Sequence, residues 1–153
     1  MFRGEVISIH VASEAAKPTE SLETVQAVAG RGLKGDRYSN GIGYWSNSPG
    51  AGREVTLIEI EDIEALSREK EIAIEPGAAR RNLVTRGVPL NHLVGREFQV
   101  GAVRMRGVRL CEPCAYLEGL TEKGVLAGLM HRGGLRAEIV KGGTIRVGDA
   151  ITE

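Results

Sequence analysis

The sequence predicts a mainly β protein that forms a single domain over residues 1–153. Its length fits one domain, since domains usually run to about 100–200 residues. Twenty-one glycines separate short runs rich in Val, Ile and Leu, a pattern typical of many short strands joined by turns. A domain of this size buries roughly 68–70% of the surface that its unfolded chain exposes, so its core requires neither a disulfide nor a structural metal.

Eight short apolar runs are expected to be strands, and several of them alternate between two faces. In the run over residues 54–60, Val55 and Leu57 fall on one face, while Thr56 and Ile58 fall on the other. The expected strands cover residues 5–11, 24–28, 54–60, 81–85, 97–100, 103–110, 137–140 and 144–147.

Helices are expected over residues 61–70 and 113–120, with a third over residues 123–130. Pro113 fits the first position of the second helix, where a missing N–H costs nothing. Cys114 would then lie in the first turn, where the positive end of the helix dipole favours a thiolate. A plain turn at Glu112 and Pro113 explains the same residues equally well.

Residues 38–52 form the segment that most resembles a loop, because they are dense in Gly, Ser and Asn and low in charge. A loop of this length inside a compact domain is typical of a functional flap, with disorder as the alternative.

The charge balance argues against nucleic acid and membrane partners. Twenty Lys and Arg balance twenty Asp and Glu, so no basic field draws the chain to nucleic acid or acidic membranes. No run approaches the ~18 apolar residues of a membrane span, and residues 1–12 alternate unlike a signal peptide. We therefore expect a cytoplasmic protein. Arginine outnumbers lysine fifteen to five, and arginine suits bidentate binding of carboxylate, phosphate and similar oxyanions.

Two cysteines, Cys111 and Cys114, stand three positions apart after an expected strand, a spacing used by metal sites and redox couples. A zinc site needs four ligands, and the three histidines are isolated in the sequence. A thioredoxin-like dithiol needs a parallel sheet of alternating strands and long helices, a rhythm that the chain lacks. The third interpretation is a nucleophilic or ligating thiolate that handles sulfur or a soft metal, with Arg109, His131 and Arg132 as neighbours favouring the thiolate. A small, buried and unreactive cysteine is the remaining alternative.

Three segments carry the residues expected around a small anionic ligand. In residues 30–38, glycines let the backbone approach a ligand while Lys34 and Arg37 supply positive charge. In residues 76–85, Asn82 opens an apolar run, and its amide can bind either ligand or neighbouring backbone. Residues 131–136 repeat the pattern of cations and glycines. We expect Arg37 and Arg132 to form the anion end of a pocket, with a solvated surface role as the alternative.

Several short motifs follow one another in an order that resembles a known family. They are Gly32-Leu33-Lys34-Gly35-Asp36-Arg37, Arg53-Glu54-Val55-Thr56-Leu57-Ile58, Pro76-Gly77, Arg81-Asn82-Leu83, Leu93-Val94-Gly95-Arg96, Val100-Gly101, Cys111-Glu112-Pro113-Cys114, Gly142-Gly143 and Val147-Gly148-Asp149. Each motif is weak alone, but their order over nearly the whole chain resembles the MOSC domain, the C-terminal domain of molybdenum cofactor sulfurases, in its small stand-alone prokaryotic form.

The resemblance implies a MOSC-type β-barrel with a few short peripheral helices. It also implies a cysteine that carries sulfur as a persulfide or ligates the molybdenum of the pterin cofactor (molybdopterin). By position this cysteine is Cys114, with Cys111 as a second catalytic thiol, and the asparagine of the family falls on Asn82. The implied partners are a molybdoenzyme or a cysteine desulfurase, which would hold pyridoxal phosphate itself. The residues assigned to cofactor binding are Lys34, Asp36, Arg37, Asn82, Arg109, His131 and Arg132.

The implied activity is that of a sulfur transferase or of one component of a molybdenum-dependent reductase. The sequence departs from the family pattern in having the additional Cys111, and it lacks the N-terminal barrel domain of the larger reductases and a flavin or iron–sulfur domain. Two alternatives stay open. The chain could be a non-catalytic module that delivers cofactor or sulfur to a partner enzyme, or a dithiol redox protein.

Overall fold

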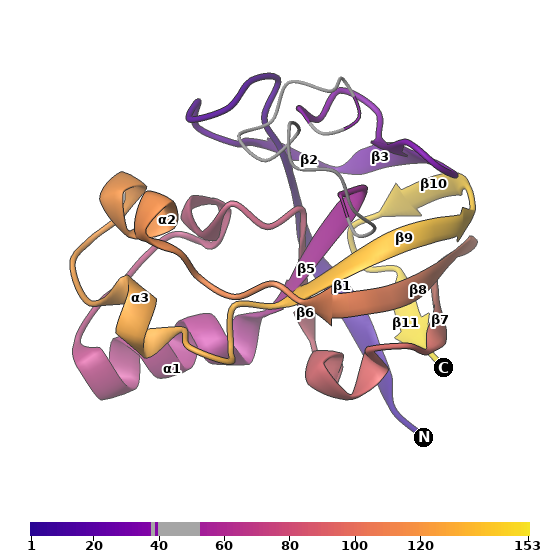
Figure 1. The fold of residues 1–153 in the computed structure, drawn as a ribbon. Coiled ribbons are helices and arrows are strands. Elements are labelled where there is room, and N and C mark those ends of the chain that lie inside the picture. The colour runs from indigo at the N-terminus through magenta and orange to yellow at the C-terminus, as the bar shows by residue number, and fades with distance from the viewer. Residues whose placement is uncertain (38, 40–52) are drawn as a thin grey trace.

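The structure is a computed structural model that describes residues 1–37, 39 and 53–153 and shows a mainly β fold (Figure 1). In the described part, strands pair in the order β11-β7-β8-β9-β5-β6-β1, and β11 also pairs with β1, which closes the sheet into a barrel. The predicted mainly β barrel with a few short helices is therefore confirmed. The barrel strands are β1 (Arg3–Val11), β5 (Val55–Glu59), β6 (Leu83–Arg86), β7 (Glu97–Val100), β8 (Val103–Leu110), β9 (Leu135–Lys141) and β11 (Ala150–Thr152).

β1 closes the barrel because it pairs with three other strands. One edge pairs with β6, and the other pairs first with β11 and then with the short β2 (Glu20–Leu22). The barrel pairings are antiparallel except for the parallel pair β5–β6. A second sheet consists of β10 (Gly143–Arg146), β3 (Thr24–Val28) and β4 (Gly32–Leu33), and its buried side chains join the barrel core.

The alternation seen in the sequence sorts side chains between the barrel core and the solvent. In β8, Val103 and Met105 are buried inside the barrel, while Arg106 points outward. On the outer face Arg106 pairs with Glu97 of β7 at 3.0 Å and with Glu138 of β9 at 2.8 Å. The inward side chains form one continuous apolar core.

The helices gather on one side of the barrel (Figure 1). α1 (Ile60–Lys70) connects the parallel strands β5 and β6, which no tight turn could join. It buries Ile63 and Leu66, and α2 (Ala115–Leu120) and α3 (Val125–Gly128) lie beside it. Two 3₁₀ helices, η1 (Pro76–Ala79) and η2 (Leu90–Leu93), complete the described elements. None of the described helices is both long and apolar enough to cross a membrane.

The structure differs from the sequence prediction in short elements and at element ends. β2, β4 and β11 were not predicted, because two or three residues are too few to display a period. α2 begins at Ala115 and not at Pro113, because Cys114 has an extended backbone with φ −140° and ψ 168°. Cys114 therefore precedes the first turn and does not lie within it. The expected flap over residues 38–52 lies outside the described residues, apart from residue 39.

Glu59, at the end of β5, gives the fold a specific pH dependence. Burial raises the pKa of its carboxyl from the ordinary 4.5 to about 7, and the like charges of Asp62 and Glu61 add to this effect. The folded state therefore binds more protons than the unfolded state between these two pH values. It follows that the contribution of Glu59 to the free energy of unfolding falls as pH rises through this window.

We expect Glu59→Gln to gain about 1 kcal/mol of stability relative to the wild type between pH 4.5 and pH 8, a figure reduced for the solvent screening of a half-buried group. Urea unfolding at both pH values measures the difference. Glu64→Gln is the matched control, because it removes an exposed carboxylate from α1, the helix that directly follows Glu59. The expectation would be contradicted if the free energy of unfolding of the wild type rose relative to that of the Glu59→Gln variant as pH rises.

Candidate functional site

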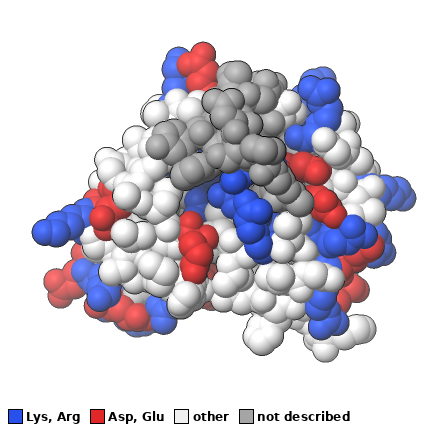
Figure 2. Space-filling model, viewed as in Figure 1, with Lys and Arg blue, Asp and Glu red and all other residues white. Residues whose placement is uncertain are grey.

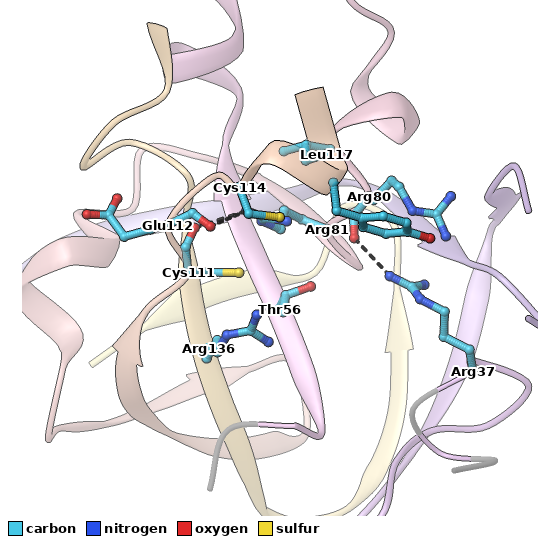
Figure 3. Close-up of a pocket in the computed structure, with 10 residues that line it drawn as sticks. Arg37, Thr56, Arg80, Arg81, Cys111, Glu112, Cys114, Leu117 and Arg136 are labelled. Atoms are coloured by element: carbon cyan, nitrogen blue, oxygen red, sulfur yellow. Dashed lines mark hydrogen bonds between the residues drawn. The ribbon is translucent and has the colours of Figure 1, made fainter. Parts of the chain in front are cut away.

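A cavity of about 110 Å³ lies where the barrel meets α2 (Figure 3). Two neighbouring strands contribute Thr56 from β5 and Arg136 from β9, which stand opposite each other in register. The segment between β8 and α2 contributes both cysteines. The lining residues are Arg37, Thr56, Arg80, Arg81, Cys111, Glu112, Cys114, Tyr116, Leu117 and Arg136.

The two thiols of the cavity differ in exposure. Cys111 directly follows β8 and is 1% exposed, and its backbone N–H donates to the carbonyl of Gly134 at 2.7 Å. Cys114 is half-buried, and its carbonyl accepts the backbone N–H of Glu118 at 3.0 Å. Both thiols are free, and Figure 3 shows both sulfur atoms pointing into the cavity. The two cysteines that the sequence predicted to act as a pair therefore line the same cavity.

The side chain of Arg81 fixes the position of the segment that carries the two cysteines. Its buried guanidinium donates from Nε to the carbonyl of Gly133 at 2.7 Å and from Nη2 to the carbonyl of Cys111 at 3.0 Å. Longer bonds of 3.4 Å reach the carbonyls of Ala79 and Glu112. Within the described residues no carboxylate pairs with Arg81. A buried positive charge therefore lies beside the thiols, balanced only by carbonyl dipoles.

Two more arginines face the cavity from other elements. Arg37 is buried, and its Nη1 pairs with Asp36 Oδ1 at 3.2 Å while its Nη2 donates to the carbonyl of Arg80 at 3.4 Å. Arg136 is half-buried, and its side chain makes no hydrogen bond or ion pair with a described residue. Its guanidinium is thus available to a ligand in the cavity.

Positive charge dominates the lining of the cavity. Glu112 is the only acidic residue among the lining residues, and its carboxylate accepts hydrogen bonds from the backbone N and Nδ1 of His131, each at 2.7 Å. In Figure 3 the carboxylate of Glu112 points away from the two sulfur atoms. Figure 2 shows Lys and Arg side chains near β5 at the centre of this face. Such a cavity favours anions.

Some predicted residues support the cavity from behind and do not line it. Asn82 is buried, its Oδ1 accepts the backbone N–H of Thr56 at 3.0 Å, and its Nδ2 donates to the carbonyl of His10 at 3.1 Å. Asp36 is also buried, and it accepts the backbone N–H of Ala12 at 3.1 Å besides pairing with Arg37. Their assigned contact with a cofactor stays a prediction, while their observed contacts position Thr56 and Arg37.

Other predicted residues lie away from the cavity. Arg132 is exposed and bonds Glu69 of α1 at 3.0 Å, so the structure brings Arg37 but not Arg132 to the cavity. His131 is also exposed; its backbone N–H and ring bond the outward carboxylate of Glu112, and its carbonyl accepts a hydrogen bond from Asn91 Nδ2 at 2.9 Å. Lys34 lies in a separate shallow groove beside β3. Arg109 is exposed on β8 and does not line the cavity.

The sequence analysis missed seven lining residues that the fold brings together: Thr56, Arg80, Arg81, Glu112, Tyr116, Leu117 and Arg136. A usable signal existed for the arginines. Arg80 and Arg81 directly precede Asn82, and Arg136 closes the glycine-rich segment over residues 131–136. Choosing between Arg132 and Arg136 required knowing that β9 begins at Leu135, one residue before the arginine that faces the cavity.

A larger cavity of about 530 Å³ adjoins the first one and shares Arg80 with it. Its lining includes His10 and Ser21 from the paired strands β1 and β2. Burial lowers the pKa of His10, whose ring lies 2.8 Å from the hydroxyl of Ser8. The two cavities together offer room for a ligand with a small anionic part and a larger body.

Fold and site define a class: a small β-barrel with an arginine-lined dithiol cavity. A family model of the MOSC domain matches residues 46–152, and the chain belongs to this family. The resemblance inferred from motif order is thereby confirmed. A comparison with curated proteins gives no match.

Solved structures share the fold at low sequence identity. The YuaD protein of Bacillus subtilis is 14% identical, with a TM-score of 0.77 over 99% of this chain and 97% of that one. YiiM from Geobacillus stearothermophilus is 12% identical, with a TM-score of 0.75 over 97% of this chain and 74% of that one. YiiM from Escherichia coli is 16% identical, with a TM-score of 0.67 over 99% and 69% of the two chains. At these identities the likeness concerns the fold alone.

Proposed function

We propose that the cavity is a thiol site that handles sulfur or molybdenum, in which Cys114 carries sulfur as a persulfide or ligates the molybdenum of a pterin cofactor. One observation carries the proposal: Cys114 is the more exposed of two thiols in a cavity lined by four arginines. The thiolate is both the nucleophilic and the metal-binding form of cysteine. Membership of the MOSC family, associated with molybdenum cofactor sulfurases, supports the same assignment.

As a sulfur carrier, Cys114 would receive sulfur from a pyridoxal-phosphate-dependent cysteine desulfurase, which presents it as a persulfide on its own cysteine. The Cys114 thiolate attacks the terminal sulfur of that persulfide. A sulfur–sulfur bond forms at Cys114, the donor's sulfur–sulfur bond breaks, and the donor cysteine leaves as a thiolate. No oxidant is consumed. Arg81 supports this step by holding the carbonyls of Cys111 and Glu112, which fixes the segment that carries the nucleophile.

The residues of the cavity also fit a molybdenum cofactor. Cys114 offers a soft thiolate ligand, and Arg37 and Arg136 offer charge-assisted hydrogen bonds to oxo or phosphate oxygens. Within residues 1–37, 39 and 53–153 no three His, Cys, Asp or Glu side chains form a metal site, so further ligands would come from the pterin. The cofactor would supply two-electron redox chemistry at molybdenum. Arg80 would contact ligand in both cavities.

Mass spectrometry of the native protein tests the sulfur-carrier role. After incubation with a cysteine desulfurase and cysteine, the protein should gain one sulfur atom, and peptide mapping should place it on Cys114. A protein that stays unmodified while the desulfurase releases sulfide into solution would contradict this role.

The alternative from another class is a non-catalytic module that delivers cofactor or sulfur to a partner enzyme. The exposed edge strand β2 and the short helices α2 and α3 near the cavity would be available to such a partner. Elemental analysis separates these functions from a pure interaction domain. Molybdenum or labile sulfur should copurify with a carrier or an enzyme, and neither should copurify with a pure interaction domain.

Cys111 gives a separate prediction, because it lines the same cavity from a buried position. We expect its thiol to attack a persulfide on Cys114, forming a Cys111–Cys114 disulfide and releasing hydrosulfide. Cys111→Ala should therefore lengthen the lifetime of the Cys114 persulfide by about tenfold or more. A time course of the sulfur adduct by mass spectrometry measures the lifetime. Equal lifetimes in wild type and variant would show that Cys111 only fills space.

A further inference from the structure

We propose that the cavity accepts a small oxyanion bearing a transferable sulfur, with thiosulfate as the simplest example, and that Cys114 takes its sulfur directly from this molecule. The inference rests on the proposed function, because it uses Cys114 as the sulfur acceptor. It goes further by giving the site a small-molecule substrate class, so that a protein donor is not required. Three features of the cavity support it: charge, size and the position of the thiols.

The charge of the cavity calls for an anion with several oxygen atoms. The guanidinium of Arg136 has no partner among the described residues, and that of Arg81 is buried without a carboxylate. The carboxylate of Glu112, the one acidic lining residue, is engaged by His131 on the outside. Guanidinium groups bind the oxygens of sulfur and phosphorus oxyanions through charge-assisted hydrogen bonds. An oxyanion would therefore supply the negative charge that the lining lacks.

The cavity has room for a small molecule. Its volume is about 110 Å³, and one water occupies about 30 Å³ in the liquid. The cavity thus has room for a compact ion of a few heavy atoms. Thiosulfate meets this limit and places three oxygens and one transferable sulfur in one molecule.

The thiols supply the chemistry once the anion is held by the arginines. The Cys114 thiolate attacks the terminal sulfur of thiosulfate, and a new sulfur–sulfur bond forms. The bond between the two sulfurs of thiosulfate breaks, and sulfite leaves with the electron pair. The products are a Cys114 persulfide and sulfite, so atoms and charge balance without an oxidant. Arg136 acts here as a binding residue for the oxyanion end.

The test mixes reduced full-length protein with thiosulfate and follows sulfite release, with mass spectrometry to locate the added sulfur. A parallel sample receives a cysteine desulfurase and cysteine. We expect sulfite release in step with a one-sulfur adduct on Cys114. Arg136→Met, which keeps the apolar stem, should lower the second-order rate of sulfite release by about 10- to 100-fold, the cost of one charge-assisted hydrogen bond. Arg68→Met is the matched control, because Arg68 is an exposed arginine on α1 outside the cavity.

Each outcome decides the proposal. Partial recovery of the rate by Arg136→Lys, which restores the charge, would support it even if the Met variant is less stable. Equal rates in wild type, Arg136→Met and Arg68→Met would overturn it, as would an adduct that forms equally on Cys114→Ser. Loading of Cys114 by the desulfurase but not by thiosulfate would overturn this inference and leave the proposed function standing. Failure of both donors would overturn both.

Discussion

Replacing Cys114 with serine should abolish sulfur acceptance, lowering the yield of the one-sulfur adduct by about 100-fold or more, because a hydroxyl is far less nucleophilic than a thiolate and forms no persulfide. The substitution is nearly isosteric at a half-buried position, so we expect little change in thermal stability. The measurement is mass spectrometry of the protein after incubation with a cysteine desulfurase and cysteine.

Cys111→Ala provides the matched control for Cys114→Ser, because it removes the other thiol of the same cavity. This variant should still gain sulfur, and it should hold that sulfur longer than the wild type. If Cys114→Ser gains sulfur at the wild-type rate and the adduct maps to Cys111, the roles of the two thiols are reversed.

The largest loss of stability is expected from Gly134→Ala. Gly134 has a φ of +110°, and a Cβ at this position would lie 1.9 Å from the carbonyl oxygen of Leu57. Leu57 pairs in register with Leu135, so the side chain cannot be accommodated without separating β5 from β9. The carbonyl of Gly134 also accepts the N–H of Cys111. We expect a loss of about 4 kcal/mol or more, a large share of the stability of a small domain.

Gly148→Ala separates the backbone strain from the steric clash. Gly148 has a similar φ of +92°, but nothing lies within 4 Å of the Cβ it would gain. Alanine there should cost only the left-handed backbone penalty, about 1–2 kcal/mol. Urea unfolding of the two variants gives both values. Equal losses would mean that the barrel relaxes around Gly134 and that the close approach to Leu57 is not a constraint.

Regular strands could be predicted from the sequence, because the alternation of apolar and polar residues marks the two faces of each strand. The prediction for β7 and β8 matches the structure at both ends, and β3 was also predicted with its observed bounds. The parallel pairing of β5 with β6 leaves no mark in the sequence of either strand. β11, with three residues, is likewise too short for its period to be detected, yet it closes the barrel.

The candidate site was only partly predictable, because its residues come from segments that meet only in the folded chain. The spacing of Cys111 and Cys114 identified the thiols, and glycine-rich surroundings identified Arg37. The same reasoning favoured Arg132, which directly precedes two glycines, over Arg136, which follows Leu135. Which of the two faces the cavity depends on the pairing of Arg136 with Thr56, a contact between residues eighty positions apart.

The closure of the barrel by β1 and β11 also determines when the protein can fold. Arg3 pairs with Thr152 and Glu5 with Ala150. β1 can therefore form this pairing only after the ribosome has synthesised β11. Contacts of such long sequence separation form slowly, since the chain loses the entropy of closing a long loop before the contact stabilises it. The thiol cavity, which needs β5 and β9 of the same barrel, is therefore completed only after synthesis has passed β11. Until then Cys111 and Cys114 belong to an open sheet.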